Sequence, residues 1–565
     1  MSSRYRTLGT SGDEKAFALS VQPNSAANLV TIKFIGTSGQ DFTVFWDIAD
    51  ASVSDTYTHT GSVITATHTY ADTDIKVVTV QGAMGKLEDP GGTTAAPDYS
   101  DILAWGNVTL IADQSDFGLY ANSIIAGTPG NVSQPNQYSN YRDWPLFVSN
   151  TNCTDMFKDS TEGYLMINRL ADSTYPSAGF GWPPSVTSNI TNMSGMFSGA
   201  FKRRLSAPGD TVTASVNGWD VSNVTDMSNC FKNTGYLNLL SDWNTINVTN
   251  MSSMFDGVAP GIVPSDCLFT NFAPGIDQWN VSNVTNMSSM FQGVQGAQGN
   301  LSLWNTQSVT NLSNTFSRSA SATPVEWNTG NVTTLSGTFY ATEGNIDCSG
   351  WNTQNTTNMS HTFSAESGLT LTESPTVTRC ATKPDLSSWN VSSVTNMANI
   401  MNGYEGSPQI DSWNVSSVTD MSYGFGANYL RATDGGGNPI NADYNASITM
   451  DPSGWVTSSL ANAQNTFSGS TLNTNLGAWN ISSITTMKNM LDDSSMSTEN
   501  YSKTLIGWAN FVSNAGGTPA SITMGAANVT YNNATHGSGT YTDAVSARAY
   551  LTGTAGWTIT DGGVV

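Results

Sequence analysis

Charged side chains are scarce in this chain. Asp, Glu, Lys and Arg make up 11% of the 565 residues, and 20 Lys and Arg stand against 43 Asp and Glu, which gives a net charge of -23 at pH 7. Nucleic-acid binding needs clustered cations that contact phosphates, and the sequence has no basic stripe. The composition therefore predicts no nucleic-acid partner and a neutral, polar surface, as in many exported and viral β-rich proteins.

Cysteine and histidine are also rare. The 5 Cys are scattered without a C-x-x-C pair, which argues against a disulfide framework, and the 4 His have no partner at metal or catalytic spacing. No G-x-S-x-G elbow, phosphate-binding glycine loop or H-E-x-x-H motif occurs. We predict no enzyme activity, no catalytic residues and no cofactor. Structural calcium stays open, because Asp242, Asp277 and Asp411 lie near repeated tryptophans.

Long hydrophobic runs are missing as well. No stretch of about 18 consecutive apolar residues occurs, so no membrane insertion is predicted. Residues 1–28 hold no apolar run that would serve as the core of a signal peptide. A surface-type repeat without an export signal suggests that the protein belongs to a particle that is assembled in the host cytoplasm and released by lysis. A tailed bacteriophage is such a particle. A non-standard export route is the alternative.

One pattern is abundant. The stretch WDVSNVTDMSNCF at 219–231 returns about ten times, with Trp at position zero, an aliphatic residue or Thr at plus five, Met, Leu or Ala at plus eight and usually Phe at plus twelve. The repeats begin at Trp219, Trp243, Trp279, Trp304, Trp327, Trp351, Trp389, Trp413, Trp455 and Trp479. Their period of about 24 residues is typical of a solenoid, in which each repeat buries its apolar side chains against its neighbours.

The spacing inside the repeat predicts a short strand that leads up to the tryptophan and a short helix that follows it. Val224, Met227, Cys230 and Phe231 fall on one helical face, and Thr225 is placed to cap that helix. Stacked strands would form a parallel sheet. The predicted core includes Trp219, Met227, Phe231, Trp243, Met251, Phe255, Trp279, Met287, Phe291, Trp413, Met421 and Phe425.

The repeat resembles that of the BspA-like leucine-rich-repeat surface proteins, whose pattern is W-[ND]-V-S-x-V-T-x-M-x-x-M-F. WNVSNVTNMSSMF at 279–291 is close to a consensus copy, and the resemblance covers roughly residues 100–500. It implies a leucine-rich-repeat solenoid used at cell or particle surfaces for adhesion and recognition, without catalytic residues. The shorter stretch ATHTYADTDIKVVTVQG at 66–82 resembles the closing hairpin of PKD-like, immunoglobulin-type modules.

We therefore predict an α/β repeat fold. It consists of a leucine-rich-repeat solenoid of short parallel strands and short helices, a small N-terminal all-β sandwich and a C-terminal α/β cap. The predicted boundaries are an N-terminal arm at 1–27, the sandwich at 28–85, a linker at 86–100, the solenoid at 101–497 and the cap at 498–565. The cap is expected to contain helices at 501–512 and 541–551, because both segments are amphipathic.

Three insertions interrupt the repeats after the plus-twelve position, and loops on a rigid scaffold are where binding usually resides. The candidate ligand-contact residues in these insertions are Phe269, Phe272, Tyr429, Asp434, Asn438 and Tyr444. Insertion without a ligand is the alternative.

The predicted function is non-enzymatic surface recognition or adhesion by a phage structural component, a fibre or exposed decoration of the virion. Its expected partners are other virion proteins, contacted through the N-terminal region, and a glycan or protein on the host surface. The alternatives are an extracellular or cell-surface bacterial adhesin, a tailspike-type polysaccharide depolymerase and a purely architectural virion subunit. The oligomeric state, including a homo-oligomer, stays open.

Overall fold

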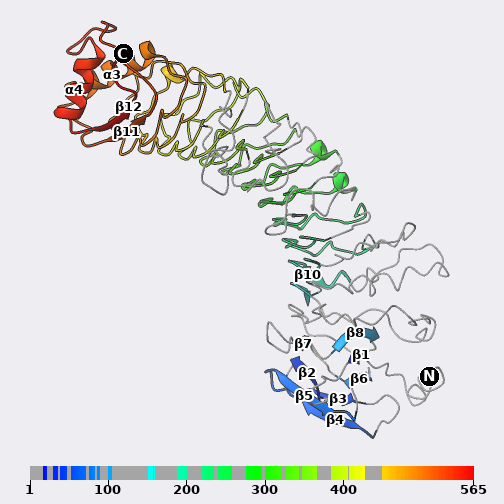
Figure 1. The fold of residues 1–565 in the computed structure, drawn as a ribbon. Coiled ribbons are helices and arrows are strands. Elements are labelled where there is room, and N and C mark those ends of the chain that lie inside the picture. Colours follow the sequence, from blue (N-terminus) through cyan, green and yellow to red (C-terminus); the bar gives the residue numbers. More distant parts are fainter. Residues whose placement is uncertain are drawn as a thin grey trace, which may run out of the picture. The chain divides into compact units, whose positions relative to one another are not determined.

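The computed structural model describes residues 17–21, 29–35, 38–46, 52–71, 76–82, 86–88, 99–104, 151–156, 158, 187–199, 216, 218–234, 240–257, 275–294, 300–319, 326–342, 347–365, 384–404, 406–426 and 448–565. The chain divides into two compact units, Met1–Val284 and Thr285–Val565. Figure 1 labels their helices and strands.

The first unit begins with two antiparallel sheets. Their strands are β1 (Phe17–Val21), β2 (Leu29–Ile35), β3 (Asp41–Phe45), β4 (Ser54–Thr58), β5 (Ile64–Thr69), β6 (Lys76–Gly82), β7 (Lys86–Glu88) and β8 (Tyr99–Ala104). One sheet has the order β4-β3-β6-β1-β8 and the other β5-β2-β7. Val30, Ile32 and Phe34 alternate along β2 and are buried. Because the rings of Phe34 and Phe42 have centroids 4.8 Å apart, the two sheets face each other across an apolar layer.

These strands extend beyond residues 28–85. β1 lies inside the predicted N-terminal arm, β7 lies inside the predicted linker, and β8 spans the predicted start of the solenoid. β1 pairs with both β6 and β8, so it is a central strand of its sheet. Its five residues, FALSV, give only a short alternating pattern, and its pairing partners lie far along the chain. The sequence pattern around β1 therefore did not show where the sheet begins.

Repeats of the first unit bridge to one another in parallel. β9 (Thr151–Asn152) pairs in parallel with β10 (Ile190–Asn192). From β10 the ladder continues through single bridges from Asn192 to Asp226 and from Asp226 to Asn250. A short 3-10 turn, η3 (Ile276–Gln278), leads into Trp279. Asp226 and Asn250 occupy the plus-seven position of their repeats, so this position carries the parallel ladder.

The second unit continues the same arrangement over more repeats. Its parallel bridges join Asn286, Asn311, Thr334, Asn358, Asn396, Asp420, Asn462 and Thr486 in that order. Short 3-10 turns, η4 (Leu301–Leu303) and η6 (Pro452–Gly454), precede Trp304 and Trp455. Backbone N–H groups at plus eight, ten and twelve donate to carbonyls of the following repeat; Met397, for example, donates to Asp420 at 2.8 Å. Backbone hydrogen bonds thus join each repeat to the next.

The structure differs from three predictions about the inside of the repeat. The segment after the tryptophan is a succession of turns rather than a helix, because the plus-ten residue has a left-handed backbone, as at Asn229 with φ 56°. A left-handed residue cannot continue a right-handed helix. Most of the described parallel bridges lie at plus seven, after the tryptophan, and one, from Gly406 to Ile448, lies seven residues before Trp413 and Trp455. Thr225 caps no helix, because its hydroxyl donates to the carbonyl of Thr191 in the preceding repeat at 3.2 Å.

Aromatic side chains fill the interior of the repeats in two columns. In the second unit the ring centroids of Trp304 and Trp327 are 6.0 Å apart, and those of Phe316 and Phe339 are also 6.0 Å apart. The Trp327 indole donates a hydrogen bond to the carbonyl of Leu301, three residues before the preceding tryptophan, at 3.0 Å. The following residues of the predicted core are all at most 3% exposed: Trp219, Met227, Phe231, Trp243, Met251, Phe255, Trp279, Met287, Phe291, Trp413, Met421 and Phe425.

The last repeat joins directly to a helical segment. α3 (Thr498–Asn514), β11 (Thr523–Ala526), α4 (Ala544–Gly553) and β12 (Thr558–Asp561) follow it. Trp508 of α3 donates its indole N–H to the carbonyl of Leu476 at 3.0 Å, as a tryptophan of a further repeat would. β11 bridges in parallel to Met487 and pairs in parallel with β12. Arg548 of α4 donates to Asp561 at 2.8 Å and to the carbonyl of Ile559 at 3.2 Å, and so covers part of the outer edge of β12.

None of the helices in the described ranges combines the length and the apolar composition that crossing a bilayer requires.

Candidate recognition surface

Three rows of uncharged polar side chains run along the repeats of the second unit, from Trp304 to Trp479. We call them the amide–hydroxyl rows. The plus-one row is Asn305, Asn328, Asn352, Asn390, Asn414, Val456 and Asn480, the plus-four row is Ser308, Asn331, Asn355, Ser393, Ser417, Ser459 and Ser483, and the plus-six row is Thr310, Thr333, Thr357, Thr395, Thr419, Ala461 and Thr485. Val456 and Ala461 are their only apolar members. The rows lie on the exposed side of a turn whose plus-two and plus-five residues point inward.

The plus-one asparagines are fixed by the turn that they begin. The side-chain oxygen of Asn352 accepts the backbone N–H of Gln354 at 3.1 Å, and that of Asn390 accepts the backbone N–H of Ser392 at 3.1 Å. Asn favours this turn because its amide reaches the backbone two residues on. The asparagine side chains are therefore held in one orientation before any partner arrives.

The plus-six threonines, and Asn331, Asn355 and Ser483 at plus four, are tied to the preceding repeat. The amide groups of Asn331 and Asn355 donate to the carbonyls of Gln307 and Gly330 at 2.8 and 2.7 Å. In the plus-six row the hydroxyl of Thr357 donates to the carbonyl of Thr333 at 3.2 Å. Each such asparagine keeps a second amide hydrogen and its oxygen, and each threonine keeps a hydroxyl oxygen as an acceptor. The rows therefore present ordered donors and acceptors.

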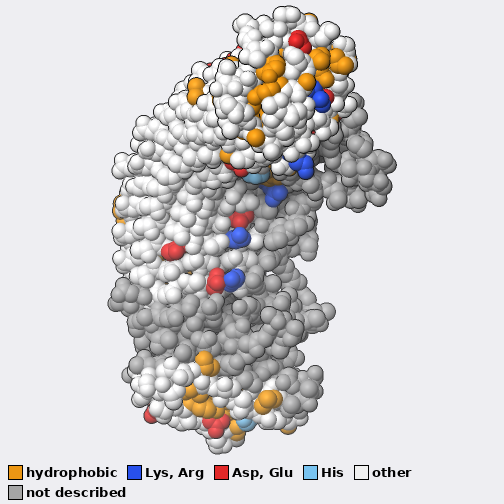
Figure 2. Space-filling model, turned by 90° about the vertical axis from the view of Figure 1, so that its left-hand side faces the viewer, with side chains coloured by type: hydrophobic (Ala, Val, Ile, Leu, Met, Phe, Trp, Pro, Cys, Tyr) orange, Lys and Arg blue, Asp and Glu red, His pale blue; other side chains and the backbone are white. Residues whose placement is uncertain are grey.

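The rows carry no charge although the chain as a whole is strongly acidic. Figure 2 shows a flank of the molecule on which uncharged polar side chains and backbone predominate, beside a column of charged side chains. The same uncharged residue types at plus one, four and six in almost every repeat were a signal in the sequence. It was missed because the plus-six threonine, as at Thr225, was interpreted as the cap of a helix.

Cationic and aromatic side chains gather elsewhere in the second unit. The guanidinium of Arg318 lies 5.5 Å from the centroid of the Tyr340 ring, and the rings of Tyr340 and His361 have centroids 6.3 Å apart in an edge-on arrangement. The three residues come from successive repeats, and all three are half-buried. Burial lowers the pKa of His361, because it disfavours the charged imidazolium.

This pKa shift predicts an acid sensitivity. Because the folded chain binds the His361 proton less readily than the unfolded chain, the free energy of unfolding should fall as the pH drops below about 6.5. The substitution His361→Asn should reduce that fall. Asn suits the left-handed backbone there, since Asn314 and Asn399 have φ 56° and 57° at the same position of their repeats. The measurement is the urea midpoint at pH 7 and pH 5.5; an equal fall in both proteins would contradict the assignment to His361.

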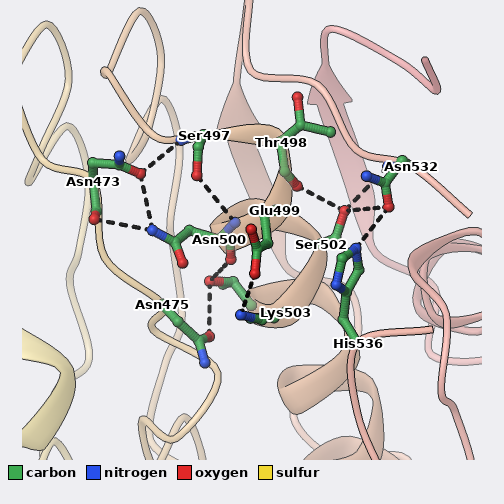
Figure 3. A network of polar contacts seen from close by, with 11 residues as sticks. Asn473, Asn475, Ser497, Thr498, Glu499, Asn500, Ser502, Lys503, Asn532 and His536 are labelled. Carbon is green, nitrogen blue, oxygen red and sulfur yellow. Dashed lines mark hydrogen bonds and ion pairs between the residues drawn. The ribbon is translucent and has the colours of Figure 1, made fainter. Parts of the chain in front are cut away.

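A polar network joins the last repeat to α3 (Figure 3). The side-chain oxygen of Asn473 accepts the backbone N–H of Ser497 and the amide of Asn500, both at 2.9 Å. On the other side of the helix the hydroxyl of Ser502 donates to the carbonyl of Thr498 at 2.7 Å and accepts the backbone N–H of Asn532 at 3.1 Å. These bonds dock α3 onto its neighbours.

The same network contains a serine and a histidine, the residue types of a hydrolase. His536 bonds to the side-chain oxygen of Asn532 at 2.8 Å, and the hydroxyl of Ser502 points to the helix carbonyl of Thr498. A nucleophile would need the imidazole as its own hydrogen-bond partner. The drawn contacts are therefore those of a structural junction.

The sequence-predicted contact residues, Phe269, Phe272, Tyr429, Asp434, Asn438 and Tyr444, all lie outside the described residues. Asp242, Asp277 and Asp411, considered for calcium, lie in different repeats, and the described residues hold no group of three or more His, Cys, Asp or Glu side chains placed to bind a metal ion.

The geometry defines a repeat protein whose successive repeats bridge in parallel and bury one tryptophan each. The model of the family described as Mycoplasma protein of unknown function, DUF285, matches residues 206–260, 265–374 and 372–504. The chain belongs to this family. The match is compatible with the resemblance to BspA-like surface repeat proteins. No curated protein matches the chain, and no solved structure matches it either.

Proposed function

We propose that this protein is a non-enzymatic surface recognition protein, whose repeats form a leucine-rich-repeat solenoid. The observation that carries the proposal is the set of amide–hydroxyl rows, in which exposed hydrogen-bonding side chains such as Asn355 and Thr357 are held in place by the neighbouring repeat. Side chains that are already ordered lose little entropy when they bind, so binding energy is not spent on fixing them. Membership of the DUF285 family supports a repeat protein of this type.

The setting that we propose is the surface of a phage virion, with attachment to other virion proteins through the N-terminal region. The polar, charge-poor composition supports an exposed particle protein, and a cell-surface adhesin is the alternative. In either setting the partner is a glycan or a protein of the host surface.

Fractionation tests the surface role. Mass spectrometry should find the protein in purified virions from an infected culture that expresses it, and washed particles should retain it. Detection in the cell-surface fraction of uninfected cells would favour the adhesin instead. Recovery solely from the cytosolic fraction would contradict both settings.

A further inference from the structure

We infer that the amide–hydroxyl rows bind an uncharged polysaccharide chain that lies along the repeats. The inference rests on the proposed function and names its ligand class and its binding surface. The juxtaposition that carries the inference is a plus-one asparagine and a plus-six threonine in six of the seven repeats from Trp304 to Trp479, exposed or half-exposed, uncharged and bonded to a backbone group, with a serine or asparagine between them at plus four.

The charge distribution selects an uncharged ligand. A polymer of carboxylates, sulfates or phosphates would approach a chain of net charge -23 against repulsion, and the rows offer no cation to compensate it. A cationic partner would find no acid in the rows either. Placing a charged ligand against neutral amides and hydroxyls removes its hydration without an ion pair, which costs free energy. A neutral ligand meets none of these penalties.

The hydrogen-bonding groups match sugar hydroxyls. A hydroxyl both donates and accepts, and the rows offer both partners: the free amide hydrogens of Asn331 and Asn355 as donors, and the hydroxyl oxygens of Thr333 and Thr357 as acceptors. The plus-six hydroxyl recurs in six of the seven repeats, and a serine hydroxyl takes the place of the plus-four amide in five of the seven. A chain of sugars therefore engages several repeats at once, and its affinity rises with its length, whereas one sugar gains few contacts.

A protein partner fits the rows less well. Hot spots of protein interfaces are enriched in Trp, Tyr and Arg, which anchor in desolvated pockets. In these repeats the tryptophans are at most 4% exposed, and the rows themselves hold Asn, Ser, Thr and two scattered apolar residues, Val456 and Ala461. The surface lacks the large anchors that would stabilise such an interface.

The chain offers a matched pair of variants for the test. In the row variant, Thr310, Thr333 and Thr357 are all changed to Ala. The fold should persist, because Ala461 occupies this position naturally, and because the carbonyl that each hydroxyl contacts also accepts a backbone N–H, as from Thr357 to Thr333 at 2.9 Å. In the control variant, Ser313, Ser336 and Ser360 of the same repeats are changed to Ala. They lie at plus nine, beyond the bridge, where Ala398 occurs naturally.

The measurement is sedimentation of the full chain with insoluble cellulose and chitin, and capture on alginate-coated beads as the acidic polysaccharide. We expect binding to at least one neutral polymer, about tenfold weaker binding by the row variant and a change of less than about twofold in the control variant. A soluble oligosaccharide of the bound polymer should compete better as a hexamer than as a dimer. Circular dichroism checks that both variants are folded.

Three results would overturn the inference: capture by alginate alone, equal loss in both variants, and no binding to either neutral polymer. If the protein is nevertheless found on virions or cell surfaces, only the ligand class and its site fail, and the recognition role stands. Its absence from those surfaces is the separate result that removes the proposed function.

Discussion

The substitution Gly507→Ala should undock α3, although alanine usually favours a helix over glycine by about 1 kcal/mol. A Cβ added at Gly507 would lie 2.5 Å from Cα and 2.7 Å from the carbonyl carbon of Gly477, and both of these atoms belong to the backbone. Backbone cannot move aside as a flexible side chain can. We expect a loss of roughly 3 kcal/mol in the free energy of unfolding, as for other insertions into a packed contact.

The control is a second helical glycine with free space. A Cβ at Gly553, the last residue of α4, meets nothing within 4 Å, so Gly553→Ala should change stability by less than about 0.5 kcal/mol. Urea unfolding compares the two variants, and limited proteolysis shows whether residues 498–565 become the first to be cleaved in Gly507→Ala. Equal midpoints for both variants would contradict the close contact of α3 with the last repeat.

The close approach of Gly507 and Gly477 shows what one sequence does not reveal. The pattern of 501–512 predicts a helix, and α3 covers that segment. Which helix face meets the repeats depends on two glycines about thirty residues apart, and each is unremarkable in its own segment. Local patterns predict elements, but the choice of neighbours depends on shape across the contact.

The repeat itself was predictable in register but not in backbone conformation. The spacing of Val224, Met227 and Cys230 by three residues fits a helix and also fits successive turns, so hydrophobic periodicity does not separate them. The plus-ten residues carried the missing information. They are frequently Asn or Gly, as at Asn229, Asn314 and Gly337, and these residues tolerate the left-handed conformation that ends a helix.

The candidate surface was predictable only in part for a related reason. Because binding usually resides on loops, the ligand contacts were predicted in the insertions and not in the repeats themselves. The six residues named there lie outside the described residues. The sequence pattern predicted only a local role at plus six, the helix cap at Thr225, and it gave no role to Asn355 and Thr357. Their bonds run instead to Gly330 and Thr333 of the preceding repeat, and such contacts appear only when the stacking of repeats is known.

The substitution Trp327→Ala should destabilise the second unit more than any other change in a single repeat. The Trp327 ring lies between those of Trp304 and Trp351, with centroids 6.0 and 6.3 Å away, and its side chain is only 4% exposed. Truncating a buried Trp to Ala costs about 3–5 kcal/mol. The carbonyl of Leu301 also loses its indole donor but keeps the backbone N–H of Trp304 at 3.1 Å, so the lost hydrogen bond adds only about 1 kcal/mol.

The loss should also change how the unit unfolds. In a repeat protein the stability is roughly a sum of repeat terms and nearest-neighbour interface terms, and Trp327 belongs to two interfaces. If both interfaces are weakened, the repeats on the two sides of Trp327 should unfold at different urea concentrations. The unfolding curve then broadens and its apparent slope decreases. Trp327→Phe, which keeps a ring in the column but removes the donor, should cost less, about 1–3 kcal/mol.

A control substitution at an exposed residue distinguishes the loss of packing in the tryptophan column from the loss of any large apolar side chain. Leu303 is 67% exposed and lies just before Trp304, so Leu303→Ala removes a large apolar side chain without opening a cavity. We expect a change of less than about 0.5 kcal/mol and an unaltered slope. If Leu303→Ala and Trp327→Ala shifted the urea midpoint equally, the tryptophan column would not be what couples one repeat to the next. The order of the plus-six row would then lose its physical basis, because its threonine side chains bond to the preceding repeat and are held only while successive repeats stay in register.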